Sequence, residues 1–366
     1  MNKLIVENLT KRFGDLVAVK NVSFNVKEGE FFSLLGPSGC GKTTTLRCIA
    51  GLETPDEGRI IIKDRDVTRL PPQERGVSLV FQEFAVFPHM TVYENLAFGL
   101  KVRKTPKEEI KKKVLEIAEI LNLKESLSKI AGRLGLSEKQ RIALGRSIIV
   151  EPEILLLDEP LTLVDAKVKE AMRRELRRLQ RDLKITILYV THDQLEAMMM
   201  SDRIAVMDAG RILQIGTPTE IYEDPKKVFV ARFIGSPTIN LLESKLITEK
   251  DEYALLIKDT EVKIHLGNTS ERNVLSKHSG RELIVGIRPE DIDISKELEP
   301  GYHFSSTIEF IEMMGERMEV YLKLNEGYIR ALTPLRTDLK EGNRVYVRIP
   351  LSKILLFEAG TEERIL

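Results

Sequence analysis

The octapeptide at residues 36–43, Gly-Pro-Ser-Gly-Cys-Gly-Lys-Thr, limits the possible folds of this chain more than any other segment. It matches the phosphate-binding pattern G-x-x-x-x-G-K-[ST], and it stands between an apolar run at residues 31–35 and a helix-compatible run at residues 43–49. In a strand, loop and helix of this kind, glycines let backbone amides turn toward a phosphate, and the helix directs its positive end at it. The sequence therefore predicts a nucleotide-binding domain of the α/β class.

The residue types in this loop predict ATP and Mg²⁺ as cofactors. Lys42 can neutralise the β- and γ-phosphate oxygens, and the hydroxyl of Thr43 can ligate Mg²⁺. The predicted nucleotide contacts are the loop and the residue after it: Gly36, Pro37, Ser38, Gly39, Cys40, Gly41, Lys42, Thr43 and Thr44.

A second chemical signal is an acidic pair at the end of an apolar run. Residues 154–157 are Ile-Leu-Leu-Leu, and Asp158 and Glu159 follow them. One acid at such a strand end can hold Mg²⁺, and its neighbour can activate the attacking water. An acidic pair alone is also typical of a solvated turn. Together with the loop it predicts ATP hydrolysis, with Asp158 as a metal ligand and Glu159 as the general base.

The hydrophobic pattern changes near residue 235. Before it, short apolar runs alternate with helical spacing, as at residues 168–183, which predicts a largely parallel sheet covered by helices. After it, short runs separated by glycine, proline, asparagine and charge predict a small all-β barrel. We therefore expect an α/β domain at residues 1–235 and a β-rich domain at residues 236–366. The strands expected in the second domain are 253–257, 262–266, 283–287, 318–324, 328–332, 345–349 and 354–357.

The composition narrows the possible partners. Lys plus Arg and Asp plus Glu are equal at 56 each, so the chain lacks the global positive field of a protein that binds nucleic acid mainly by charge. No apolar run approaches the roughly 18 to 20 residues of a membrane-spanning helix, so contact with a membrane would come through a partner. The two cysteines do not form a disulfide or metal pattern, which favours a reducing compartment. The arginine-rich stretch at residues 173–181 is interpreted as a solvated helix face.

These motifs resemble the ATP-binding-cassette ATPases, and among them the sugar-importer ATPases, typified by the motor subunit of the maltose transporter. The resemblance covers nearly the whole chain, because residues 286–290 and the β-rich run resemble the oligonucleotide-fold (OB) regulatory domain of these importers. It implies that Phe13 stacks on adenine, that Gln82 lies near Mg²⁺ and the attacking water, and that His192 contacts the γ-phosphate. The expected catalytic residues are then Glu159, His192, Gln82 and Lys42, and the expected metal ligands are Thr43, Gln82 and Asp158.

The same resemblance implies an ATP-hydrolysing motor subunit of a membrane importer, with a sugar as the family-level expectation for the solute. Two cassettes would close head to tail over two ATP molecules. The expected partners are membrane-spanning permease subunits that meet residues 83–100, a second cassette in a homodimer or heterodimer, and indirectly an extracytoplasmic solute-binding protein. No nucleic acid is expected as a partner. The expected location is peripheral, on the cytoplasmic face of the cell membrane.

The chain departs from the family at one loop and in a neighbouring segment. The family's signature loop reads Leu-Ser-Gly-Gly-Gln and contacts ATP held by the opposite subunit, whereas residues 134–138 here read Leu-Gly-Leu-Ser-Glu. An acid aimed at a triphosphate is repelled, and Leu136 adds a side chain where the backbone should approach closely. Leu163 likewise stands where the family has a small or amide residue. We expect an impaired half-site and hypothesise an asymmetric pair with a second, intact cassette. The alternative is that Glu138 points away and the change is harmless.

Two other functions fit parts of the sequence. A soluble ATP-binding-cassette ATPase of translation or DNA repair would commonly carry two cassettes or a long coiled-coil insertion, and neither pattern occurs in the sequence. A P-loop kinase would leave Gln82, His192 and the β-rich region unexplained.

Overall fold

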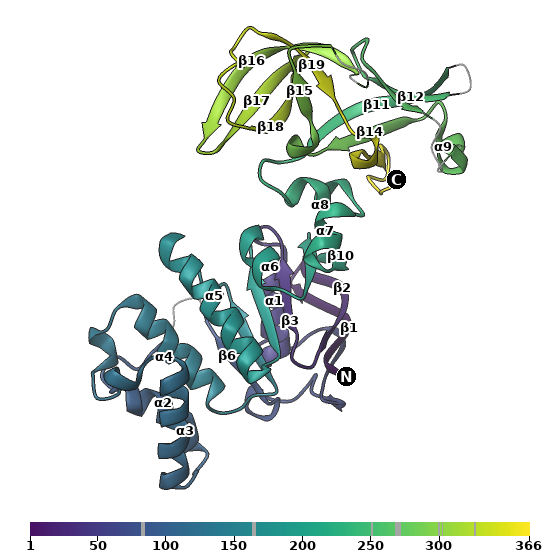
Figure 1. Cartoon of the computed structure of the whole chain (residues 1–366). Helices are drawn as coiled ribbons and strands as arrows, with labels where there is room; N and C mark the ends of the chain where they lie inside the picture. The colour runs from purple at the N-terminus through teal and green to yellow at the C-terminus, as the bar shows by residue number, and fades with distance from the viewer. Residues whose placement is uncertain are drawn as a thin grey trace. The chain divides into compact units, whose positions relative to one another are not determined.

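The computed structural model describes residues 1–81, 85–162, 166–249, 252–267, 272–298, 301, 303–325 and 327–366. The chain divides into two compact units, Met1–Ile221 and Tyr222–Leu366 (Figure 1). The division precedes residue 235 because helix α8 (Val228–Phe233) packs with the second unit, where Val228 and Ala231 contact Ile239 and Phe357. The domain boundary expected after residue 235 stays a prediction.

A six-stranded sheet forms the centre of the first unit. Its strand order is β10-β9-β3-β8-β7-β6, and all neighbours are parallel except β10 and β9. The strands are β3 (Phe31–Leu35), β6 (Val77–Val80), β7 (Ile154–Asp158), β8 (Ile187–Thr191), β9 (Arg203–Asp208) and β10 (Arg211–Gly216). Side chains of β3 and β8 are buried along their whole length, as expected for central strands covered on both faces. The predicted α/β fold is confirmed.

An antiparallel sheet covers one side of this centre. Its order is β2-β1-β4-β5, with β1 (Asn2–Phe13), β2 (Leu16–Lys27), β4 (Glu57–Ile62) and β5 (Arg65–Asp66). Leu4 and Phe24 of this sheet share one core with Leu46 of helix α1 (Lys42–Ala50) and Leu188 of the central sheet. Helix α1 is therefore held between two sheets, which fixes the loop that precedes it.

The remaining helices of the first unit build two further cores. Helix α5 (Ala166–Leu183), expected at residues 168–183, places Met172 and Leu176 against Leu157 and Tyr189 of the central sheet. Helices α2 (Val92–Val102), α3 (Lys107–Ile120) and α4 (Leu136–Ile148) pack around a core of their own. The short helices α6 (Gln194–Met200) and α7 (Pro218–Glu223) follow β8 and β10. Within the described ranges, none of the helices combines the length and apolarity that a bilayer crossing requires.

The second unit consists mainly of two five-stranded sheets around one core, so the predicted β-rich domain is confirmed. Their orders are β13-β12-β11-β14-β20 and β15-β19-β16-β17-β18, and a short helix, α9 (Arg272–His278), follows β13. The strands are β11 (Asn240–Glu249), β12 (Glu252–Ile257), β13 (Lys263–Gly267), β14 (Glu282–Ile287), β15 (Asp293–Ser295), β16 (Phe304–Met314), β17 (Arg317–Leu324), β18 (Gly327–Pro334), β19 (Arg344–Arg348) and β20 (Leu355–Glu358).

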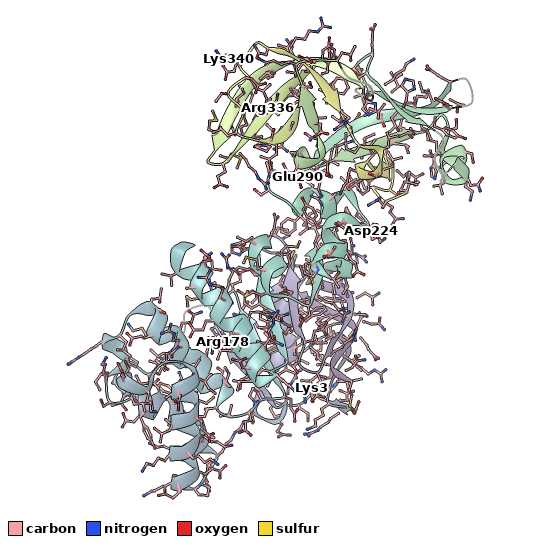
Figure 2. The ribbon with its side chains drawn as sticks, viewed as in Figure 1. Lys3, Arg178, Asp224, Glu290, Arg336 and Lys340 are labelled. Atoms are coloured by element: carbon pink, nitrogen blue, oxygen red, sulfur yellow. The ribbon has the colours of Figure 1, made fainter. Side chains whose placement is uncertain are left out.

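Arg288, just after β14, connects the start of the second unit to its sheets. Its guanidinium donates to the carbonyls of Ile234, at 2.9 Å, and Tyr222, and it lies 3.5 Å from the centre of the Tyr222 ring. The Tyr222 hydroxyl donates to Glu290, which Figure 2 labels at this place. Burial lowers the pKa of the Arg288 guanidinium to about 10, although the charge of Asp291 opposes the shift. The two carbonyl hydrogen bonds and the Tyr222 ring, rather than water, therefore stabilise the charge of the Arg288 guanidinium.

Replacing Arg288 by methionine should destabilise the second unit by about 2 to 4 kcal/mol, because two carbonyls would lose their donor in a buried place. Urea unfolding of the full chain, followed by tyrosine fluorescence, measures the loss. Arg317→Met is the control, since Arg317 is exposed at the start of β17. An equal effect of both substitutions would contradict the role assigned to Arg288.

Candidate functional site

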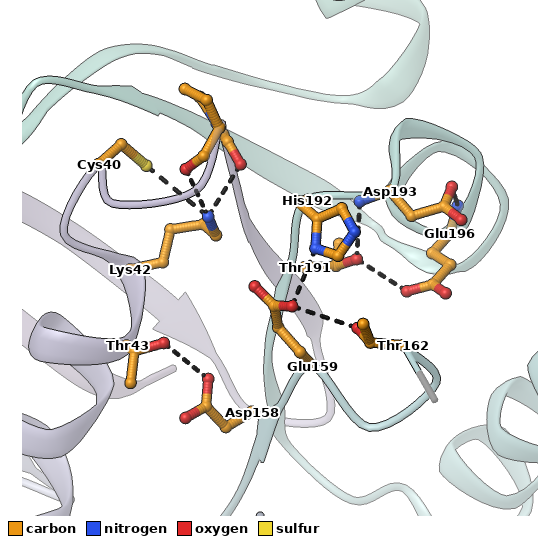
Figure 3. A network of polar contacts seen from close by, with 12 residues as sticks. Cys40, Lys42, Thr43, Asp158, Glu159, Thr162, Thr191, His192, Asp193 and Glu196 are labelled. Atoms are coloured by element: carbon orange, nitrogen blue, oxygen red, sulfur yellow. Dashed lines mark hydrogen bonds and ion pairs between the residues drawn. The ribbon is translucent and has the colours of Figure 1, made fainter. Parts of the chain in front are cut away.

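Three parallel strands of the central sheet end at one edge and bring the candidate site together (Figure 3). The glycine-rich loop follows β3, Asp158 ends β7, and His192 follows β8. In parallel sheets, ligands bind outside the carboxyl ends of the strands. Residues far apart in the sequence therefore share one site because the strand register aligns their ends.

The loop at residues 36–41 requires glycine at three positions. Gly39 and Gly41 have φ values of 81° and 103°, which L side chains rarely adopt. A Cβ at Gly36 would lie 2.2 Å from the carbonyl oxygen of Met207, and one at Gly41 would lie 2.3 Å from that of Ala18. The loop is thus pressed between β9 and β2, while Ser38 and Gly39 at its tip are exposed.

Lys42 lies folded over this loop. Only 3% of its surface is exposed, and its Nζ donates to the carbonyls of Gly36 and Pro37, both at 2.8 Å. The Cys40 thiol is 3.8 Å from the same ammonium, and burial raises its pKa, although Lys42 opposes the shift. Cys40 is therefore a packed thiol rather than a reactive one. The lysine charge is held at the centre of the loop, where the phosphate is expected.

Thr43 and Asp158 form the oxygen-rich part of the site. The Thr43 hydroxyl donates to Asp158 Oδ1 at 3.0 Å. Burial raises the pKa of the Asp158 carboxyl; the hydrogen bond from Thr43 opposes this rise, and repulsion from Glu159 adds to it. Thr44, the next residue of α1, is half-buried beside Thr43. Hydroxyl and carboxylate oxygens are the ligand types that Mg²⁺ prefers.

Asp158→Asn should raise the melting temperature of the nucleotide-free chain near neutral pH. The pKa of Asp158 is higher in the folded than in the unfolded chain, so the folded state holds its proton more tightly, and stability falls as pH rises through the folded pKa. Asparagine removes that charge and keeps an acceptor for Thr43. The gain should vanish below the ordinary pKa of aspartic acid, about 3.9. Scanning fluorimetry at several pH values measures it, with exposed Asp15→Asn as the control. A lower melting temperature for Asp158→Asn at neutral pH would contradict this.

Glu159 and His192 are in direct contact. Glu159 Oε2 lies 2.8 Å from His192 Nδ1 and accepts a hydrogen bond from Thr162 at 3.2 Å. Glu159 adopts φ = 46°, in the left-handed region, and its amide donates to the carbonyl of Val190 at 3.0 Å. This backbone bond ties the end of β7 to β8. The constrained backbone therefore fixes the carboxylate beside the imidazole.

A buried acid, Glu196, supports the loop that carries His192, and the sequence analysis did not identify it. Glu196 is 1% exposed, and it accepts hydrogen bonds from Tyr189 and Thr191, each at 2.7 Å. Burial raises the pKa of this carboxyl, while the two hydroxyl donors oppose the rise. Asp193 caps α6 through the amides of Leu195 and Glu196. The sequence signal that could have revealed Glu196 is an acidic residue on the apolar face of helix α6, together with Ala197 and Met200.

The structure places Phe13 at the end of β1, with 46% of its surface exposed and the Lys11 ammonium 5.0 Å from its ring centre. Its hairpin partner β2 reaches the loop at Ala18. Gln82 lies outside the described residues, as does Leu163. The expected roles of these residues remain predictions.

Glu138 closes the N-terminus of its own helix. The helix α4 begins after Gly135, whose amide donates to Glu138 Oε2 at 3.4 Å, and Ser126 donates to Glu138 Oε1 at 3.0 Å. The carboxylate thus lies where the helix dipole attracts an anion and makes the glutamate half of a capping box, since Gly135 has no side chain to make the other half. Leu136 is 47% exposed beside it. Both carboxylate oxygens of Glu138 therefore have partners within its own unit, and whether the loop impairs the opposite ATP site stays a prediction.

Models of known families match three parts of the chain. The ABC transporter family matches residues 19–162, the MalK OB fold domain matches residues 235–292, and the TOBE domain matches residues 285–357. The first match contains the glycine-rich loop and the acidic pair, and the other two lie in the β-rich unit.

Several curated proteins are similar over nearly their whole length. The trehalose/maltose import ATP-binding protein MalK of Thermococcus litoralis is 43% identical and aligns over 97% of both chains. The oligosaccharides import ATP-binding protein MsmX of Bacillus subtilis is 41% identical over 95% of both. The sn-glycerol-3-phosphate import ATP-binding protein UgpC 1 of Rhizobium etli is 40% identical, over 98% of this chain and 96% of its own.

Solved structures of ATP-binding cassettes resemble about three fifths of the chain. The cbiO1 protein of Clostridium perfringens, part of an ABC transporter complex, aligns with a TM-score of 0.57 and 29% identity, over 60% of this chain and 90% of its own. An ATP-binding cassette of an ABC transporter in its ADP conformation aligns with a TM-score of 0.56 and 28% identity, over 63% of this chain and 98% of its own.

Proposed function

Since this chain belongs to the ABC transporter ATPase family, in the branch that carries MalK-type OB and TOBE domains, we propose that it is the motor subunit of a sugar importer. The observation that carries the proposal is the contact of Glu159 with His192 at the sheet edge that also holds Lys42 and the Thr43–Asp158 pair. ATP is the substrate of this family. Two cassettes and membrane-spanning permease subunits form the working assembly.

The loop geometry supports a seat for the ATP phosphates. The tail of ATP would lie on the amides of residues 36–43 at the N-terminus of α1, where the helix dipole favours an anion. Lys42 would exchange the carbonyls of Gly36 and Pro37 for phosphate oxygens. Phe13 would take the adenine ring on its exposed face. These assignments agree with the position of the Lys42 ammonium, which the carbonyls of the loop already hold in the free chain.

The Thr43–Asp158 pair fits Mg²⁺, and Gln82 is the third proposed ligand. Mg²⁺, when bound, neutralises charge on the β- and γ-phosphates. The charged form of Asp158 is disfavoured by burial in the free chain, so a cation would relieve a cost that the fold already bears.

Hydrolysis would proceed through Glu159. Its carboxylate takes a proton from water as the water oxygen bonds to the γ-phosphorus, and the bond from that phosphorus to the bridging oxygen of ADP breaks. With Nδ1 protonated, His192 donates to Glu159 and orients it. Inorganic phosphate and ADP then leave. Through its hydrogen bonds from Tyr189 and Thr191, Glu196 would hold the loop of His192 in position, and it would not touch the substrate.

Residues 1–235 would form the cassette and residues 236–366 the regulatory domain. The relatives named above are import proteins for sugars or sn-glycerol-3-phosphate, which supports uptake of a sugar or a sugar-like solute. The expected place of the chain is the cytoplasmic face of the membrane, bound to its permease. An extracytoplasmic solute-binding protein would act on the other side without touching this chain. A role on nucleic acid has no support from the relatives.

Uptake by cells of the source organism tests the proposal. The chromosomal gene is replaced by Lys42→Ala, and uptake of radiolabelled maltose, trehalose and sn-glycerol-3-phosphate is measured beside Lys107→Ala, an exposed residue of α3. We expect Lys42→Ala, but not Lys107→Ala, to abolish uptake of one of these solutes. Unchanged uptake of all three would argue against the proposed solute class, and ATPase assays of the purified chain test the chemistry separately.

A further inference from the structure

Helix α5 carries an arginine cluster that ATP hydrolysis does not use. Its members are Arg173, Arg174, Arg177, Arg178 and Arg181, and Figure 2 labels Arg178 on this helix. Together with Met199 and Met200 of α6 they line a surface hollow of about 400 Å³. A second hollow of about 540 Å³ shares Arg177 and Arg181 with the first and extends to Lys184. We call the two hollows the α5 groove.

The groove has an excess of positive charge. Arg174 pairs with Glu170, Arg178 with Asp182, and Arg177 with Asp202. By contrast, Arg173, Arg181 and Lys184 form no ion pair with any residue that the structure describes. A helix face that served only solvation would be expected to balance its charges along the helix, as the first and second pairs do at i,i+4 spacing. The three unpaired cations need another explanation.

Arg173 is the least expected of them. It is only 8% exposed, and its Nε is buried without a hydrogen-bond partner in the described part of the chain. A buried N–H without an acceptor costs free energy, because water is removed from it and nothing replaces that water. Such a group is retained at a cost to the fold, and because Arg173 also lines the first hollow, an anion there would stabilise its charge.

We propose that the α5 groove binds a small molecule that carries at least two phosphate groups. Guanidinium forks match phosphate oxygens in bidentate geometry, and phosphate supplies negative charge to the three cations that form no ion pair with the described residues. Arg173 lines only the first hollow and Lys184 only the second, so we assign one phosphate group to each hollow. The site is distinct from the glycine-rich loop and does not depend on ATP hydrolysis.

The test uses the full chain with Lys42→Ala, so that the loop at residues 36–43 no longer competes for phosphate. Tripolyphosphate is titrated calorimetrically without magnesium. We expect one bound equivalent, and we expect Arg173→Met and Arg181→Gln each to weaken binding about tenfold or more, as the loss of a charge-assisted hydrogen bond implies. The control is Arg69→Gln. Arg69 is exposed and lies outside the α5 groove, so this change should alter the affinity less than about twofold.

Thermal unfolding separates binding from a purely structural role. In phosphate-free buffer, Arg173→Met should raise the melting temperature, because it replaces an unpartnered buried charge by an apolar side chain. Tripolyphosphate should stabilise the Lys42→Ala chain and fail to stabilise the chain that also carries Arg173→Met. Absence of binding, or equal affinity in the Arg181→Gln and Arg69→Gln chains, would overturn the proposal. So would a lower melting temperature of Arg173→Met, because Arg173 would then serve the fold.

Discussion

Glu159→Gln should lower the steady-state ATPase rate by about 10²- to 10⁴-fold, the range that a positioned general base contributes. The amide keeps the size of the side chain and can still meet His192 and Thr162, but it cannot take a proton from water. ATP binding should be unchanged, because Glu159 is not among the groups expected to hold the phosphates. Release of inorganic phosphate and binding of a fluorescent ATP analogue measure the two effects.

The matched control is Glu151→Gln, at an exposed acid that pairs with Lys113 on the surface of the same unit. It should leave the ATPase rate within about twofold of the native rate, since exposed ion pairs contribute little. A Glu159→Gln chain that keeps a tenth or more of the native rate would show that another group accepts the proton. The assignment of the general base would then be wrong, whereas the ATP site itself would stand.

Restoring the loop at residues 134–138 to Leu-Ser-Gly-Gly-Gln should raise the ATPase rate of the purified chain by about 10- to 100-fold. The change removes the Glu138 carboxylate from the N-terminus of α4 and the exposed side chain of Leu136. The helix end would then be free to accept the phosphate held by a second copy of the chain, and oriented donors of this kind contribute about 10² or more to rate.

Glu138→Gln alone separates charge from shape, because it keeps the length of the side chain and removes the negative charge. The glutamine side chain could still accept a hydrogen bond from the Gly135 amide, so the loss is that of the charge at the helix N-terminus, about 0.3 to 1 kcal/mol, and unfolding curves must accompany the rates. If the native chain already turns over rapidly and restoration changes the rate less than about twofold, the native loop serves a homodimer and our interpretation of Glu138 is wrong. If the native chain is nearly inactive and restoration revives it, the native loop is degenerate and a partner cassette with an intact loop must be sought.

The groups changed in these two experiments could be predicted from the sequence to different extents. The glycine-rich loop and the acidic pair were predictable because each lies in a short segment whose residues dictate their own conformation. Gly41 must have positive φ and Asp158 must follow an apolar strand, wherever the rest of the chain goes. For Glu138, the sequence showed the departure from the family but not which groups the carboxylate contacts. The hydrogen bond from Ser126 depends on how the segment before α4 packs against it.

In the β-rich unit, too, some elements could not be predicted from their own residues. The seven strands expected there fall on strands or overlap them, because each alternates or concentrates apolar residues in a short run. The central strands β11 and β16 were not predicted, since many of their side chains face solvent and their pattern is weak. Both pair with two neighbours, so their place is set by partners far along the chain rather than by their own residues.

By itself, the sequence determined the α/β class of the first domain, the β-rich class of the second, the phosphate loop and the acid that follows β7. Only the tertiary structure decided that Glu159 meets His192, that Glu196 is buried beneath them, and that Arg173 lacks a partner in the described residues. The physical reason is that turn conformation and hydrophobic period depend on neighbours in the chain. Burial and pairing of charged side chains depend on which distant strands and helices the fold brings together, and no local pattern records that.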